Sequence, residues 1–165
     1  MARLDRAIIW LTAIAVVLLM LAMVGSILAG VFFRYVLNSA LPWPEELARF
    51  AMIWLTMLGA GLVARYGGHI AVTVFIGRLD GWAKRLVTWI GRVAVVLFLV
   101  LLLWFGADMT GRAGRQHSAA LEWSMSIPNL AIPLGAALIL YHLAMIAFRR
   151  EDTGGRPPRL PFERE

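Results

Sequence analysis

The chain has 165 residues and no cysteine, which excludes disulfides, thiolate metal sites and a cysteine nucleophile. Apolar residues make up 61% of the chain and charged residues only 16%, whereas a soluble domain is about 45–50% apolar. The net charge of +6 is confined to short stretches between long uncharged ones. This segregation indicates membrane topology and not binding to nucleic acid, so we predict an all-α integral membrane protein.

Four stretches are apolar enough and long enough to cross a bilayer. Residues 7–33 carry no charge and would form a helix about 40 Å long, against a hydrocarbon core about 30 Å thick. A cleaved signal peptide is the competing interpretation, but it requires a shorter apolar region and a small-residue cleavage site. Further spans are expected at about 44–66, 82–107 and 123–148. In the last of these, Pro128 and Pro133 predict a kink or a late helix start.

The connecting segments predict the orientation of the chain. Residues 69–81 mix apolar and charged positions and are expected to lie in the membrane interface, whereas 108–122 form a polar loop. Residues 151–165 are charged and rich in Pro and Gly, so we expect a disordered tail after a membrane domain at 1–150. Lys and Arg number two before the first span, four in 65–85 and five in the tail, but two in each of the other connections. By the positive-inside rule, both termini are predicted to be cytoplasmic.

The segment 42–49, PWPEELAR, has the features of a helix start. Proline suits the first helical position, and the carboxylates of Glu45 and Glu46 meet the positive end of the helix dipole. Arg49 follows Glu45 by four residues, which is the favourable order for an ion pair. Capping does not explain Arg49, which is expected either at membrane depth or against a partner, where an ion pair with Glu45 or with another subunit would lower the cost of its charge. Small residues at Gly25 with Ala29, Ser26 with Gly30, and 59–61 predict close helix contacts.

Three histidines are the candidates for haem or metal ligands. His69 and His142 are both expected near one leaflet, where they could hold a haem between facing helices, as in the membrane anchor of a respiratory enzyme. The plainer interpretation is an interfacial His69 and a His142 packed between helices, with His117 in the polar loop. A small self-sufficient exporter is a third hypothesis, but such carriers commonly need a carboxylate inside a span, and the predicted spans contain none deep in the membrane.

The order of the motifs resembles the small membrane subunit of tripartite ATP-independent periplasmic (TRAP) transporters, the DctQ-like family. The resemblance covers roughly Arg3 to Arg150, with a stretch at 43–49 that is similar to the family's Trp-x-Glu-Glu-x-x-Arg. The supporting residues, in chain order, are Asn38, Trp54, Leu58-Gly59-Ala60, Ala64-Arg65, His69-Ile70, Ser118-Ala119-Ala120-Leu121 and Ile132-Pro133-Leu134-Gly135. Glu122 and Trp123 make the loop before the last span more polar than the family pattern, and Arg92 interrupts the third span.

The resemblance implies a scaffold subunit without a substrate site, cofactor, metal or enzymatic activity. It would lie in the bacterial inner membrane and pair with a large DctM-like membrane subunit that performs sodium-driven uptake of an organic acid. A periplasmic binding protein would deliver that acid, and loop 108–126 could help to dock it. Lipids and these proteins are the expected partners, and nucleic acid is not. The residues expected at the subunit interface are Trp43, Glu45, Glu46, Arg49, Trp54, Gly59, Gly61, Arg65 and His69.

Overall fold

The computed structural model describes residues 2–65 and 81–152, and the secondary structure there is helical apart from the connections. The long helices are α1 (Ala2–Tyr35), α2 (Trp43–Arg65), α4 (Gly81–Ala113) and α6 (Ala131–Asp152), with a short α5 (Ser126–Asn129) before the last. Four segments are long and apolar enough to cross a membrane, namely Asp5–Tyr35, Trp43–Arg65, Trp82–Ala113 and Ser126–Ile146. The predicted all-α membrane fold is therefore confirmed. The predicted interfacial segment 69–81, apart from Gly81, and the tail after 152 lie outside the described residues.

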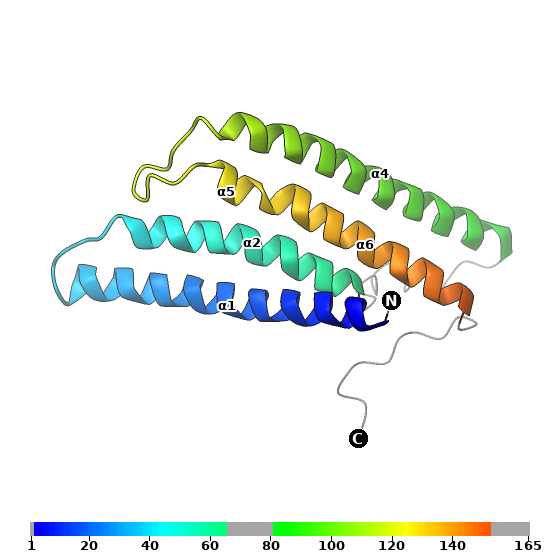
Figure 1. Ribbon diagram of the computed structural model, residues 1–165, viewed down its shortest axis with the longest axis horizontal. Coiled ribbons are helices and arrows are strands. Elements are labelled where there is room, and N and C mark those ends of the chain that lie inside the picture. Colours follow the sequence, from blue (N-terminus) through cyan, green and yellow to red (C-terminus); the bar gives the residue numbers. More distant parts are fainter. Residues whose placement is uncertain (1, 66–80, 153–165) are drawn as a thin grey trace, which may run out of the picture.

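The helices lie side by side in a single layer in the order α1, α2, α6, α4 (Figure 1). Among the described helices, α1 packs against α2, α2 against α6, and α6 against α4, whereas α1 does not contact α4 or α6. The central pair, α2 and α6, runs in one direction, and the two outer helices run in the other (Figure 1). Both faces of such a layer are available to lipid or to another protein.

The two ends of the layer differ in what they contain. At one end, which we call the hairpin end, lie residues 36–42 between α1 and α2 and residues 114–125 between α4 and α5 (Figure 1). At the opposite end, which we call the termini end, α1 and α4 begin and α2 and α6 end (Figure 1). Asn38 adopts a left-handed backbone conformation with φ of 49°, and the Ser39 N–H donates to the Phe33 carbonyl at 3.0 Å. This turn allows the chain to leave α1 and enter α2.

One helix boundary differs from its prediction, and another agrees with it. α4 continues to Ala113, six residues past the predicted end at Ala107, so the connection is the hairpin 114–125 and not the whole of 108–122. The ion pair of Asp108 with Arg112, one helical turn apart, stabilises this added length. The predicted late start of the last span is confirmed, because α5 ends at Asn129 and α6 begins at Ala131. Pro133 has no N–H to donate to the carbonyl four residues before it, which accounts for the break.

Glycines allow the closest approaches between helices within the layer. A Cβ added to Gly135 would lie 2.7 Å from the Met57 Cβ, and one added to Gly61 would lie 2.7 Å from the Leu138 Cδ2. These two glycines therefore set the distance between α2 and α6. Gly30 similarly faces Pro44, whose Cβ lies 3.2 Å from the position of an added Cβ. Gly25 has nothing within 4 Å, so it does not form the close contact that its spacing predicts.

Candidate functional site

The start of α2 separates two neighbouring carboxylates that the sequence does not distinguish. Trp43 and the buried Pro44 begin the helix, and the next two residues point to different surroundings. Glu45 pairs with Arg49 at 3.4 Å, and the side chains of Glu45 and Arg49 are 78% and 60% exposed. Glu46 turns instead toward the hairpin 114–125 of the same chain, more than seventy residues later in the sequence.

The Glu46 carboxylate is surrounded by three consecutive backbone N–H groups. Oε1 accepts from Ala119 at 3.0 Å and Ala120 at 3.1 Å, while Oε2 accepts from Ala120 at 3.1 Å and Leu121 at 3.0 Å. Successive N–H groups that converge in this way form an anion-binding concavity. Glu46 therefore fixes the tip of the hairpin to the start of α2, which is a role within this chain.

The hairpin also has bonds of its own that give it a defined shape. The Ser118 N–H donates to the Trp123 carbonyl at 2.8 Å, and the Met125 N–H donates to the Gln116 carbonyl at 2.9 Å. Glu122 takes a left-handed conformation with φ of 54°, which closes the turn. The segment with Ser118-Ala119-Ala120-Leu121 is thus a preformed loop whose tip supplies the donors for Glu46.

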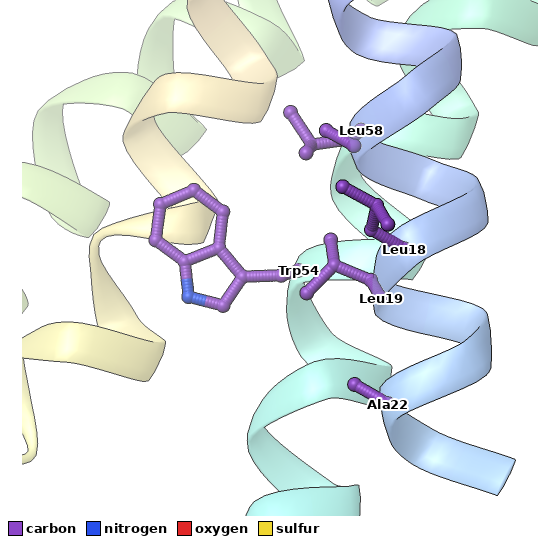
Figure 2. Close-up of a pocket in the computed structure, with 6 residues that line it drawn as sticks. Leu18, Leu19, Ala22, Trp54 and Leu58 are labelled. Carbon is purple, nitrogen blue, oxygen red and sulfur yellow. The ribbon is translucent and has the colours of Figure 1, made fainter. Parts of the chain in front are cut away.

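Trp54 connects α2 to the start of the last span. Its indole N–H donates to the carbonyl of Ile127, in the short helix α5, at 3.1 Å. The ring borders an open apolar hollow of about 530 Å³ between α1 and α2. In Figure 2 the indole extends from α2 toward α5, and Leu18, Leu19 and Ala22 of α1 lie on the other side of the hollow. Trp54 is therefore engaged inside the chain at its polar atom.

A buried ion pair joins α1 to α2 at the termini end. The Arg65 guanidinium lies 3.0 Å from the Asp5 carboxylate, and their side chains are only 6% and 3% exposed. One turn earlier on the same face of α2, the Gly61 carbonyl lies 2.9 Å from Nδ1 of His142, which is fully buried. The predicted packing of His142 between helices is confirmed. His69, its suggested companion in a haem site, lies outside the described residues.

The predicted interface residues thus fall into distinct groups. Glu46, Trp54, Gly61 and Arg65 make contacts within the layer, as given above. Glu45 and Arg49 point away from it, and Gly59 has nothing within 4 Å of an added Cβ. Whether any of these residues contacts another subunit stays a prediction.

Sequence reasoning did not identify Asp5 or the backbone of 119–121 as functional groups. Asp5 looked like an ordinary residue before an apolar run, because only the folded chain brings Arg65 beside it. Backbone donors carry no side-chain signature at all. The segment 118–121 was nevertheless among the motifs that carried the family resemblance.

The chemistry of these groups is that of helix attachment. Among the residues that the structure describes, no three His, Asp or Glu side chains cluster in a way that could hold a metal ion. The two hollows described by the structure are both apolar. Fold and site therefore define a multi-pass membrane protein whose polar groups hold its own helices together.

Comparison with known proteins identifies the family. Residues 23–153 match the family model described as "Tripartite ATP-independent periplasmic transporters, DctQ component", and the chain belongs to this family. The family is a component of transporters and not a family of enzymes. The resemblance seen in the motifs is thereby confirmed.

Three relatives show how the chain compares with longer proteins. It is 31% identical over 119 residues to the C4-dicarboxylate TRAP transporter small permease protein DctQ of Rhodobacter capsulatus, covering 71% of this chain and 52% of the relative. It is 30% identical to the isethionate TRAP transporter permease protein DctMQ of Oleidesulfovibrio alaskensis, covering 75% of this chain and 21% of the relative. It is 25% identical to the sialic acid TRAP transporter permease protein SiaT of Haemophilus influenzae, covering 82% and 22%. The matches therefore span about half of the small relative and about a fifth of the two permease proteins.

Proposed function

We propose that this chain is a scaffold subunit that pairs with a large DctM-like membrane subunit in sodium-driven uptake of an organic acid. A periplasmic binding protein would deliver the acid. The observation that carries the proposal is that the relatives DctMQ and SiaT contain a region similar to this chain within permease proteins about five times as long as that region. A chain similar to one part of a larger permease is suited to associate with the remainder as a separate subunit.

The architecture supports a scaffold role. A single layer of helices offers a broad surface to a neighbour, and the two hollows described above are lined by apolar side chains. Membership of the DctQ component family favours the scaffold role over the two alternatives, a haem-binding membrane anchor and a self-sufficient exporter. We propose the bacterial inner membrane as its location.

The Lys and Arg distribution supports a cytoplasmic termini end. Eleven of these residues lie in the sequence segments 3–6, 65–85 and 149–164, which adjoin the termini end, against four near the hairpin end, namely Arg34, Arg49, Arg112 and Arg115. The hairpin 114–125 would then face the periplasm, where it could meet a binding protein.

Co-purification tests the pairing. The chain should be expressed with an affinity tag beside the large TRAP membrane subunit of the same organism, extracted in mild detergent and analysed by size-exclusion chromatography with mass determination. We expect one stable complex that contains both proteins. A tagged chain that emerges alone and monodisperse, with the large subunit folded in the same extract, would refute the proposal.

A further inference from the structure

One narrow stripe of α2 faces away from the layer along its whole length. Every other residue of α2 is buried or half-buried, because α1 and α6 flank this helix. The exposed residues follow one another at intervals of three or four, which places them on one helix face. They are Glu45, Arg49, Met52, Thr56, Ala60 and Val63.

The composition of this α2 stripe differs from the surfaces of the outer helices. Exposed positions of α1 and α4 are mostly large apolar side chains, such as Leu11 at 70%, Leu21 at 65% and Phe105 at 62% exposure. The stripe instead combines two charges, a threonine and an alanine with only two larger apolar residues, Met52 and Val63. Gly59 beside it has open space around an added Cβ. In membranes, small and polar residues concentrate where helices pack against helices, whereas lipid itself is matched by large apolar side chains.

Arg49 gives the stripe a specific chemical requirement. It lies about 9 Å along the helix from Trp43, since each residue adds about 1.5 Å. Within the described part of the chain its ion-pair partner is Glu45, one turn nearer the helix start and even more exposed. A guanidinium facing hydrocarbon is costly, and acceptors on a neighbouring protein lower that cost. The other charged groups of α2, Glu46 and Arg65, already have acceptors or donors inside the chain.

An apolar hollow continues the stripe toward the termini end. It has a volume of about 270 Å³ and lies between α2, α4 and α6. Ala60 and Val63 belong to both the stripe and the hollow, whose other walls include Phe98 of α4 and Leu143 of α6. A hollow of this kind can receive a bulky apolar side chain from a helix that lies along the stripe.

We propose that a transmembrane helix of the large subunit packs along the α2 stripe, with a carboxylate or a row of backbone carbonyls opposite Arg49 and an apolar side chain in the adjoining hollow. The assignment rests on the proposed function. The relatives DctMQ and SiaT support this occupant over lipid, because each carries a region similar to this chain within a single permease protein. The charge of Arg49 agrees with this occupant, because a neighbouring helix can offer further acceptors beside Glu45 at a depth where lipid tails offer none.

Photocrosslinking tests the docking face without disturbing the fold. Benzoylphenylalanine should be placed singly at Met52 or Val63 on the stripe, and at Val100, an exposed position of α4, as the matched control. Each variant is co-expressed with the large subunit and irradiated in membranes. We expect a crosslinked product with the large subunit from Met52 and Val63 and none from Val100. Crosslinks from Val100 alone would overturn the assignment of the face while leaving the pairing itself intact.

Substitutions provide a second and independent measurement. Arg49→Leu removes a charge that would be costly against lipid, so the amount of complex should be unchanged or higher if this face meets lipid, and lower if it meets an acceptor. Ala60→Trp should reduce the recovered large subunit about tenfold, because it overfills the contact. Ala107→Trp makes the same change at an exposed position of α4 six residues from the end of that helix, and should have no effect.

The outcomes separate the two proposals. Unchanged recovery for both Arg49→Leu and Ala60→Trp would overturn the docking face. If Ala60→Trp fails to fold, as shown by aggregation of the chain alone, the crosslinks from Met52 and Val63 decide. If the unmodified chain recovers no large subunit, the proposed function fails, and this inference fails with it.

Discussion

The carboxylate of Glu46 shows how one side chain can organise a loop far away in the sequence. Three consecutive backbone N–H groups at the tip of the hairpin donate to this carboxylate. The carboxylate supplies two oxygens in the right place, and charge-assisted hydrogen bonds are stronger than neutral ones. Its neighbour Glu45 cannot replace it, because it points along the exposed stripe of α2.

Glu46→Gln should loosen the hairpin and leave the helices in place. The amide keeps one acceptor oxygen, but the charge is lost and its NH₂ group would oppose a backbone donor. Since the chain has no cysteine, a single spin label at Ala119→Cys can report on the tip. We expect higher label mobility and a lower Tm for Glu46→Gln, and little change for the control Glu45→Gln. Equal effects of the two substitutions would contradict the assigned role.

The buried ion pair of Asp5 with Arg65 allows a prediction about the stability of the folded chain. Breaking a buried ion pair by removing one partner leaves an uncompensated charge and costs about 3–5 kcal/mol. Asp5→Asn should therefore lower the Tm markedly. The double variant Asp5→Leu with Arg65→Met removes both charges and should recover most of the loss, because a packed apolar pair is often as stable as a buried ion pair. Thermal unfolding in detergent measures both, and a double variant as unstable as Asp5→Asn would be inconsistent with this account.

At the scale of elements, glycines determine which helices can approach each other. Gly135 lies against Met57, and a Cβ added to Gly135 would lie 3.2 Å from the backbone carbonyl oxygen of Met57. Gly25 faces open space. The same substitution should thus have opposite effects at the two positions. Both follow the small-residue pattern of membrane helices, and only the structure separates them.

Gly135→Ala should destabilise the chain by about 1–3 kcal/mol, because α2 and α6 must move apart. Gly25→Ala should leave stability unchanged or raise it by about 0.5–1 kcal/mol, since alanine is the better helix former. Tm values of the two variants in the same detergent provide the comparison. A stabilising Gly135→Ala would show that the α2–α6 contact is looser than described.

The spans could be predicted from the sequence, but their neighbours could not. Uncharged runs locate helices because hydrocarbon excludes charge, and Pro128 and Pro133 indicated the break between α5 and α6. The end of α4 was placed too early, because the polar pair Asp108 and Arg112 resembled a loop. The packed and exposed sides of these helices are similarly apolar. The spacing of apolar residues along the sequence therefore does not reveal which helix lies next to which. The contact of Glu46 with 119–121 was equally hidden, since it depends on how two connections meet in space.

For the molecule as a whole, the single layer explains why so much apolar surface is exposed. A closed bundle would bury one side of every helix, whereas here α1 and α4 each have one flank against a neighbour. Under the proposed function such a layer would widen the large membrane subunit, and the α2 stripe with Arg49 is the face that we propose for the contact. The hairpin held by Glu46 lies at one end, and the ion pair of Asp5 with Arg65 lies at the other.

The proposed orientation can be measured directly. Green fluorescent protein fused to either terminus should fluoresce, because it folds in the cytoplasm and not after export in unfolded form. Alkaline phosphatase inserted after Gly114, in the hairpin, should be active, since that enzyme needs the periplasm. Activity of phosphatase at a terminus would reverse the orientation and remove the hairpin from contact with any binding protein.

Transport in proteoliposomes tests the central claim, that this chain supports transport by a partner and provides no route of its own. The large subunit, this chain and the loaded binding protein are reconstituted together and separately under a sodium gradient. We predict uptake of the bound organic acid when both membrane proteins are present, and none with this chain and the binding protein alone. Uptake by this chain without the large subunit, or equal uptake by the large subunit without this chain, would contradict the account.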